Sequence, residues 1–275
     1  MNANTLDIVR LTPVIGAEIH GVDLSEPLDE ATFAAVHRAL MDHLVIFFRD
    51  QTMDHAQQKA LGARFGTLHV HPAAPSVPGH PEVMIIHADA NSKFVNGESW
   101  HSDVSCDENP PMGSILHIRA LPEVGGDTMF ANMYRAYEAL SAPMRAMLAG
   151  LTALHDGELL YRGRYTANDV GRVYPKAVHP VVRTHPVTRR QALFVNSFFT
   201  SRINELSPSE SDALLALLFR HIETPEFACR FRWRRNSVAF WDNRSAQHHA
   251  LWDYFPEVRS GTRVTIQGDR PFFRA

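Results

Sequence analysis

The sequence of 275 residues predicts a mainly β fold, a β-sandwich or jelly roll flanked by helices, in a single domain covering residues 1–275. Short apolar and aromatic runs recur along the chain, and Gly, Pro, Asn and Asp cluster between them, as in strands joined by turns. The helical patterns are scattered and do not alternate regularly with the strands, which argues against a doubly wound parallel sheet. No internal repeat and no Gly/Ser-rich linker divides the chain.

The predicted strands are four to seven residues long in most cases, and each is rich in Val, Ile, Phe or Trp. They are Ile8–Leu11, Ala17–Ile19, Leu44–Phe48, Val83–His87, Ser114–Arg119, Val178–Thr184, Ala192–Val195, Phe231–Trp233, Val238–Asp242 and Arg263–Gln267.

Four segments have the pattern of helices: Glu30–Asp42, Asp54–Phe65, Asn132–Leu148 and Pro208–His221. Asp54 is followed three residues later by Gln57, which is a capping-box arrangement, and Gly66 is placed to end that helix. The last helix has Ser207 as its N-cap and Pro at its first position.

The composition excludes several classes of protein. Hydrophobic residues make up 45% of the chain and charged residues 21%, which is enough apolar material for a core. The net charge of −3, without blocks of like charge, argues against a nucleic-acid or anionic-membrane partner. Two cysteines and the lack of a signal-peptide pattern predict a cytoplasmic protein.

The stretch from Trp100 to Asp103 carries the main chemical signal. If it forms a strand, His101 and Asp103 project from the same face and can bind one metal ion together. His248, which follows an apolar strand, is the candidate third ligand. Two His and one carboxylate are typical of non-haem Fe(II) oxygenases. The same residues also fit a hydrogen-bonded surface pair with an unrelated histidine.

Two further features favour the metal site. Thr128 ends a Gly-Gly-Asp-Thr loop that runs into a β-type stretch, and Arg259 and Arg263 lie four residues apart in or next to a strand. Such a spacing places both guanidinium groups on one side of the sheet. Guanidinium groups bind carboxylates in a bidentate manner, so a dicarboxylate co-substrate would fit beside them.

Taken together, these residues resemble the taurine dioxygenase (TauD/TfdA) family of Fe(II)/2-oxoglutarate-dependent dioxygenases. The likeness covers nearly the whole chain and implies a double-stranded β-helix (jelly roll) and a homo-oligomer. Its ordered blocks are Ile15–Leu24, Phe48–Gln51, Arg64–Gly66, the His101-Ser-Asp103 and Gly125–Thr128 motifs, His179–Pro186, Trp241–His248 and Gly268–Phe272.

The resemblance also implies roles for these residues. His101, Asp103 and His248 would bind Fe(II). Arg259 and Thr128, with Arg263 close by, would hold the distal carboxylate of 2-oxoglutarate. The co-substrate and O2 would then be converted to succinate and CO2 as a C–H bond of the substrate is hydroxylated.

The substrate implied by the resemblance is a small organic acid, above all taurine or a related alkanesulfonate, which would release sulfite. His71 and Arg263 match the residues that bind the sulfonate, and Phe199 matches an aromatic residue of the pocket. The two polar residues that hold the amine of taurine, a Tyr and an Asn, are replaced here by Ala74 and Gly97, and the adjacent Asn96 is the residue that would compensate. A neighbouring Ser-Phe pair of the family corresponds to Leu160 and Tyr161. A sulfate ester or an aryloxyalkanoate is therefore an alternative substrate.

Four further interpretations follow from the sequence. A zinc hydrolase with the same His/Asp/His set has no use for a dicarboxylate clamp, and a non-catalytic jelly-roll module that binds an acid has no use for an intact triad. Trp100 and Trp241 are expected to pack in the core. The long segment Val70–Glu98, rich in Pro and Gly, is expected to close over the site as a lid.

Overall fold

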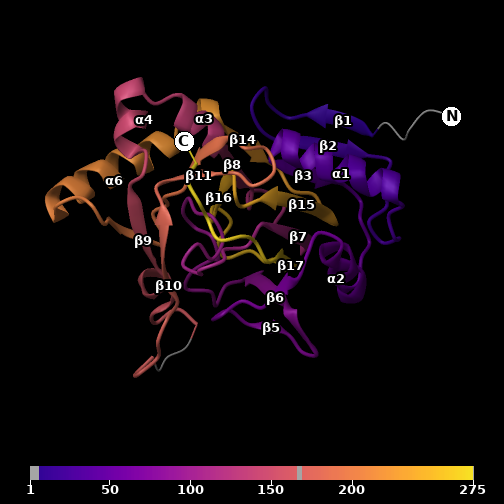
Figure 1. Cartoon of the computed structure of the whole chain (residues 1–275). Coiled ribbons are helices and arrows are strands. Elements are labelled where there is room, and N and C mark those ends of the chain that lie inside the picture. Colours follow the sequence, from indigo (N-terminus) through magenta and orange to yellow (C-terminus); the bar gives the residue numbers. More distant parts are fainter. Residues whose placement is uncertain (1–5, 166–168, 275) are drawn as a thin grey trace.

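The fold, described by a computed structural model for residues 6–165 and 169–274, is built on a nine-stranded sheet with helices outside it (Figure 1). The strand order is β1-β2-β3-β15-β7-β17-β6-β5, and β4 pairs with β17. All pairings are antiparallel except that of β2 with β3. The strands are β1 Asp7–Arg10, β2 Ala17–His20, β3 Val45–Phe48, β4 Leu68–His69, β5 Ser76–Val77, β6 His80–Ala88, β7 Gly113–Ala120, β15 Ser237–Asp242 and β17 Arg259–Ile266.

A second sheet of three antiparallel strands packs against one face of the large sheet. Its order is β14-β8-β16, and its strands are β8 Thr128–Asn132, β14 Ala228–Phe231 and β16 Ala246–Ala250. Phe47 of the large sheet stacks on Phe231 of the small one, with ring centroids 3.8 Å apart. Phe130 of the small sheet meets Trp241 of the large one at 5.7 Å. The two packed sheets confirm the predicted double-stranded β-helix.

Two further sheets lie beside the β14-β8-β16 sheet; strands β9 and β10 of the first are labelled in Figure 1. The first has the order β10-β9-β13 and the second pairs β11 with β12. Their bounds are β9 Thr152–Asp156, β10 Lys176–Pro180, β11 Val182–Thr184, β12 Gln191–Leu193 and β13 Thr200–Ile203.

Helices cover the outside of these sheets. The first two pack on the outer face of the large sheet, where they share an apolar cluster with Ile46, Phe48 and Phe240. Capping boxes begin α2, at Asp54, and α6, at Ser207, as the sequence predicts. The helices are α1 Glu30–His43, α2 His55–Ala63, α3 Met133–Glu138, α4 Ala142–Leu148, α5 Glu158–Tyr161, α6 Pro208–Ile222 and the 3₁₀ turn η1 Pro225–Phe227. None of the helices in the described part of the chain is long and apolar enough to cross a membrane.

Several predicted boundaries are wrong. The helix predicted for 132–148 is two helices, since Ser141 starts α4 as a new N-cap. The strand predicted for 178–184 is two strands in different sheets, β10 and β11. The strand predicted for 231–233 covers residues 228–231, and α2 ends at Ala63.

The segment 70–98 is not one continuous loop. Its middle forms β6, which is buried in the large sheet through pairing with β17 from Arg259 to Val264. A lid covering the whole segment is therefore excluded, because moving β6 would break that pairing. Only the stretches on either side of β5 and β6 are irregular.

Candidate active site

His101, Asp103 and His248 converge between the two packed sheets, all buried. Asp103 Oδ1 lies 3.7 Å from His101 Nε2 and 3.9 Å from His248 Nε2. One ligand atom from each residue lies within 4.8 Å of the others. Separations of this size allow one divalent ion to bind all three residues.

The two histidines are held by the backbone. His101 donates its backbone N–H to the His248 carbonyl at 3.1 Å, and His248 donates to the His101 carbonyl at 2.9 Å. His101 is an isolated bridge residue, and Asp103 lies in the turn that follows it. The prediction that residues 101–103 form a strand is therefore wrong; the turn, not strand alternation, brings the two side chains together.

The tautomer of His101 fits metal binding. Its Nδ1 lies 2.8 Å from the carbonyl oxygen of Ser99, which can only accept, so Nδ1 carries the proton. The lone pair of Nε2 is then free and faces Asp103 Oδ1. A ligand histidine that donates its other ring N–H to a carbonyl is the arrangement that orients and strengthens metal-bound imidazoles.

Asp103 is held by a network that fixes its Oδ2, while its Oδ1 faces the two histidines and accepts from Arg263. Ser114 Oγ donates to Asp103 Oδ2 at 2.7 Å, and Asn243 Nδ2 donates to Ser114 Oγ at 3.2 Å. Asn243 Oδ1 accepts from the backbone N–H of Asp103 at 3.2 Å and from Trp241 Nε1 at 2.9 Å. Trp241 thus packs in the core, as predicted, and also fixes Asn243.

Arg263 is the counter-charge of Asp103. Its Nη1 donates to Asp103 Oδ1 at 2.5 Å, and both side chains are buried. Burial alone would raise the pKa of the Asp103 carboxyl, but Arg263 and the two histidines outweigh that effect and hold the pKa well below its usual range. The group is therefore a carboxylate, as a metal ligand must be.

Arg259 lies in the same strand as Arg263 and lines the same cavity. Its Nε donates to the Gly126 carbonyl at 2.9 Å, and its Nη2 lies 3.4 Å from Thr128 Oγ1. Thr128 also accepts from Trp233 Nε1 at 2.9 Å. Because no carboxylate hydrogen-bonds to Arg259 among the described residues, its remaining donors can bind an anion in the cavity.

His71 is a neutral donor. Its Nδ1 accepts from the backbone N–H groups of Ala73 and Ala74, at 3.1 Å and 2.9 Å, so the proton of the neutral ring is on Nε2. Burial, together with Arg263, lowers the pKa of His71 to about 3. The ring packs edge-on against Tyr161 and Tyr165 and lines the cavity.

The cavity gathers almost every residue that the sequence singled out. The residues lining it include His71, Asn96, Tyr161, Phe199, Arg259, Arg263 and the three candidate ligands. Thr128 does not line the cavity itself but reaches it through Arg259. His69, two residues before His71, has its Nε2 2.9 Å from Asp107 Oδ2.

The positions that resemble an amine site in taurine enzymes offer fewer acceptors here. Gly97 has φ +87°, and a Cβ at this position would lie 3.0 Å from His101 Cε1. Asn96 Oδ1 already accepts from the Tyr165 hydroxyl at 2.7 Å. Ala74 packs at the edge of the apolar core. The substitutions therefore remove acceptors for an ammonium group without supplying others.

Sequence reasoning missed four residues of the site: Ser114, Asn243, Arg164 and Tyr165. Asn243 lies inside the Trp241–His248 block, and that motif was its only signal. The other three join the site through contacts with residues distant in sequence, which a local sequence pattern cannot predict. Arg164 Nη2, for example, donates to Glu98 Oε1 at 2.6 Å and to the Val95 carbonyl at 2.8 Å.

Over nearly its whole length the chain is similar to proteins of one family. Residues 7–265 match the family described as taurine catabolism dioxygenase TauD, TfdA. An alpha-ketoglutarate-dependent sulfate ester dioxygenase of Pseudomonas putida is 37% identical over 98% of this chain and 92% of its own length. An alkylsulfatase of Acinetobacter baylyi is 36% identical over 96% of this chain and 86% of its own.

A solved structure has the same fold. The crystal structure of a taurine dioxygenase from Burkholderia xenovorans superposes with a TM-score of 0.85 at 40% identity, covering 97% of this chain and 90% of that one. The family model spans nearly all of the described chain, and both relatives exceed 30% identity over most of it. The chain therefore belongs to the TauD/TfdA family and is a dioxygenase that depends on Fe(II) and 2-oxoglutarate.

Proposed function

We propose that this enzyme oxidises an anionic alkyl sulfate ester at the carbon next to the ester oxygen, with alkanesulfonates as second substrates. His101, Asp103 and His248 would bind the iron. Arg259, supported by Thr128, would bind the distal carboxylate of 2-oxoglutarate. Arg263 and the Nε2–H of His71 would hold the sulfate of the substrate, and Phe199 and Tyr161 would form the wall against its carbon chain.

The charge of the cavity carries this proposal. Three arginines line it, namely Arg164, Arg259 and Arg263, whereas Asp103 is the single carboxylate among the described lining residues. Arg164 is paired with Glu98 and Arg263 with Asp103. Among the described residues, Arg259 is therefore the lining arginine without a carboxylate partner, and no lining carboxylate is free to pair with an ammonium group. A zwitterion such as taurine would place its ammonium group without a free acceptor, at a cost of about 1–3 kcal/mol for each unmade hydrogen bond. An anion with an apolar chain has no such cost.

The names of the two relatives support the sulfate ester over the other acids. One is described as a sulfate ester dioxygenase and the other as an alkylsulfatase. The similarity to a taurine dioxygenase keeps sulfonates as the second class. The aryloxyalkanoate alternative has no particular support from the cavity.

The protein's own part in the reaction is to bind, orient and exclude water. When bound, Fe(II) and 2-oxoglutarate supply the activation of O2: one oxygen atom ends in succinate, as CO2 is lost, and the other enters the C–H bond. Arg263 and His71 would hold the sulfate so that the adjacent carbon faces the metal side of the cavity. The hydroxylated ester then breaks its C–O bond to sulfate, giving an aldehyde, inorganic sulfate and a proton.

His71 suits this role because its protonation is fixed. A histidine with a pKa of about 3 remains neutral at physiological pH, and its acceptor nitrogen is already occupied by backbone N–H groups. It can therefore only donate toward the cavity. Arg263 supplies the positive charge beside it.

The test is a parallel assay of hexyl sulfate, hexanesulfonate and taurine with Fe(II), 2-oxoglutarate and O2. Succinate, together with sulfate or sulfite, is quantified for each. We expect equimolar succinate and sulfate from hexyl sulfate, and a kcat/KM for taurine at least about 100-fold lower, which corresponds to two lost hydrogen bonds. Taurine turned over as well as hexyl sulfate would refute the proposal. Asp103→Ala serves as the inactive control.

We further propose that the enzyme works in the cytoplasm as a homo-oligomer. The cytoplasmic assignment is supported by two free cysteines, Cys106 and Cys229, both buried. The oligomer follows from the family resemblance. Size-exclusion chromatography with light scattering tests it, and a monomer at micromolar concentration would contradict it.

A further inference from the structure

We propose that a groove outside the active-site cavity binds the hydrocarbon tail of the substrate, so that medium-chain rather than short-chain alkyl sulfates are preferred. This inference rests on the function proposed above, and it adds a second binding site and a preferred chain length. The groove is lined by Pro75, Ile85, His87, Asn91, Ser92, Lys93, Phe94, Asn96 and Tyr165.

The groove adjoins the cavity directly. Asn96 and Tyr165 line both spaces. The groove has a volume of about 450 Å³. The cavity must also hold the metal and 2-oxoglutarate, so a long carbon chain has to continue elsewhere. Three other hollows, next to Arg190, Leu28 and Asn204, share no residue with the cavity.

A row of aromatic rings leads from the anion-binding residues to the groove. His71 is 6.0 Å from Tyr165, and Tyr165 is 6.0 Å from Phe94, measured between ring centroids. Both contacts are edge-on. Tyr165 therefore lies between the residue proposed to hold the sulfate and the ring at the floor of the groove. A carbon chain that starts at His71 and Arg263 can follow this apolar path outward.

The boundary between the two spaces is thin. A single hydrogen bond of 2.7 Å, from the Tyr165 hydroxyl to Asn96 Oδ1, joins the side chains that separate them. Arg164 holds the same two segments at their other end through Glu98 and Val95. Its guanidinium stacks over Phe94 at 4.3 Å and closes one side of the groove. Separation of Tyr165 from Asn96 would open the path while Arg164 keeps the two segments in place.

The chemistry of the lining selects the tail of an amphiphile. Ile85, Phe94 and Pro75 offer apolar surface, while Lys93 and His87 lie at the solvent side. An alkyl sulfate has its charge at one end only, and Arg263 would bind that end inside the cavity. Each methylene group placed on the apolar floor increases affinity by about two- to fourfold.

The experiment measures binding rather than turnover. The protein is loaded with Mn(II) and N-oxalylglycine, a non-reacting analogue of 2-oxoglutarate, and titrated by calorimetry with butyl, hexyl and octyl sulfate below micelle formation. The same lengths are tested as sulfonates and as carboxylates. Comparing the affinities of sulfates, sulfonates and carboxylates of one length tests the proposed function. Comparing the affinities of butyl, hexyl and octyl sulfate tests the groove.

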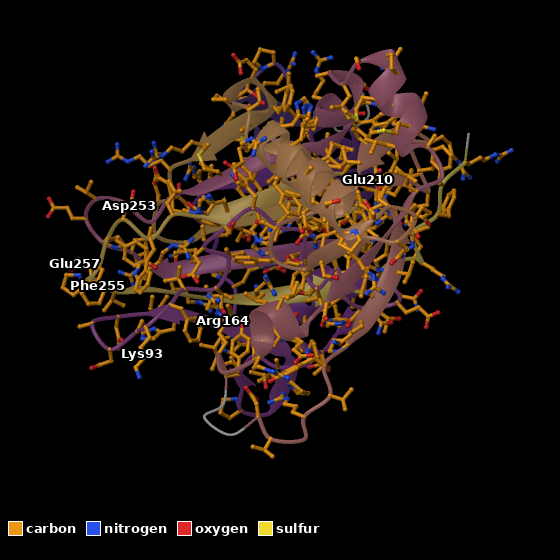
Figure 2. All side chains as sticks on the ribbon, turned by 90° about the vertical axis from the view of Figure 1, so that its left-hand side faces the viewer. Lys93, Arg164, Glu210, Asp253, Phe255 and Glu257 are labelled. Atoms are coloured by element: carbon orange, nitrogen blue, oxygen red, sulfur yellow. The ribbon has the colours of Figure 1, made fainter. Side chains whose placement is uncertain are left out.

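Two variants alter the groove alone. Asn91→Trp fills it from an exposed position whose backbone N–H bond to Asp89 is kept, and Ile85→Glu makes its floor polar. Ile85→Leu keeps the apolar surface. Ala216→Trp, on the exposed face of α6, controls for an added indole; Figure 2 shows Glu210 of this helix on the opposite side of the molecule from Lys93 at the groove.

In the wild type, octyl sulfate should bind at least about tenfold more tightly than butyl sulfate, since four methylenes are added. Asn91→Trp and Ile85→Glu should abolish this gain and leave butyl sulfate within about twofold of wild type. Ile85→Leu and Ala216→Trp should still bind octyl sulfate more tightly than butyl sulfate, as the wild type does. An unchanged gain in both groove variants, or no gain in the wild type, overturns the tail site. Tight binding of carboxylates but not sulfates would overturn the proposed function alone, and binding of no acid would overturn both.

Discussion

The hydroxyl of Ser114 donates a 2.7 Å hydrogen bond to Asp103 Oδ2 and thereby fixes which oxygen of this carboxylate faces the two histidines. The other oxygen, Oδ1, is the atom nearest to His101 Nε2 and His248 Nε2. A ligand held in this way binds a metal through one oxygen. Ser114 is itself oriented by Asn243, which donates to it at 3.2 Å.

Replacing Ser114 with Ala should weaken metal binding by about 10- to 100-fold, because the carboxylate loses the group that orients it. Competition titration with Co(II) and a chelating indicator measures this without any turnover. Asn243→Asp should have a similar effect, since its carboxylate competes for the proton that Ser114 gives to Asp103. Unchanged Co(II) affinity in both variants would show that Ser114 is only a packing residue.

Arg259→Gln should raise the KM for 2-oxoglutarate by about 10- to 100-fold, because a charge-assisted pair with the distal carboxylate is lost. The turnover number at saturating co-substrate should change much less. Arg259→Lys keeps the charge but not the planar pair of donors, so its KM for 2-oxoglutarate should lie between those of the wild type and of Arg259→Gln. Steady-state kinetics in 2-oxoglutarate provide the measurement. A KM that stays at the wild-type value in Arg259→Gln would place the distal carboxylate elsewhere.

Gly97→Ala should reduce metal affinity, because its Cβ would lie 3.0 Å from His101 Cε1. The backbone strain at its φ of +87° adds to the instability, by about 1 kcal/mol. Gly79→Ala is the matched control: its φ is +79°, and a Cβ there meets nothing within 4 Å. Thermal unfolding should therefore change in both variants, while Co(II) affinity falls only in Gly97→Ala. Equal Co(II) affinities would show that the site accommodates a side chain at position 97.

Acid should destabilise the metal-free protein well above the range in which carboxylates titrate. Burial lowers the pKa of His117 and of His179 to about 4. In the unfolded chain these groups take up protons near pH 6.5, so the unfolded state is favoured as the pH falls below that value. The stability they contribute is complete above pH 6.5 and is lost progressively toward pH 4.

Between pH 6.5 and 5 this effect amounts to about 2 kcal/mol for each histidine. His179→Gln keeps a donor for the Asp107 carbonyl, now 2.9 Å from His179 Nε2, but removes the titrating ring. Melting temperatures in a chelator, measured from pH 7.5 to 5, should fall less steeply in this variant than in the wild type. If the melting temperature falls equally with pH in the variant and in the wild type, protonation of His179 does not cause the loss of stability.

The site was easier to predict than the boundaries of the elements. Arg259 and Arg263 share a face because strand alternation is a local rule, and β17 obeys it between these positions. The length of the helix near 132–148 was not predictable in the same way. An apolar stripe continues across 139–141, and the break depends on Ser141 capping a second helix.

The His101–Asp103 pair shows a correct result reached through a wrong structure. Strand alternation predicted that both side chains face the same way, and they do, but in a turn in which Val104 has a positive φ. Ser114 and Tyr165 illustrate the limit of the sequence. Each acts through a partner distant in sequence, Asp103 and Asn96 respectively, and nothing local marks either contact.

The reciprocal main-chain bonds between His101 and His248 make the spacing of these two candidate metal ligands a property of β-pairing rather than of side-chain packing. The geometry needed for chelation is thus in place once the chain has folded, so the ordering of these two ligands is part of folding and not of metal capture. Side chains around the cavity can change with the substrate while this spacing stays constant. Substitutions in the cavity lining can therefore alter which substrate fits without altering the distance between His101 and His248.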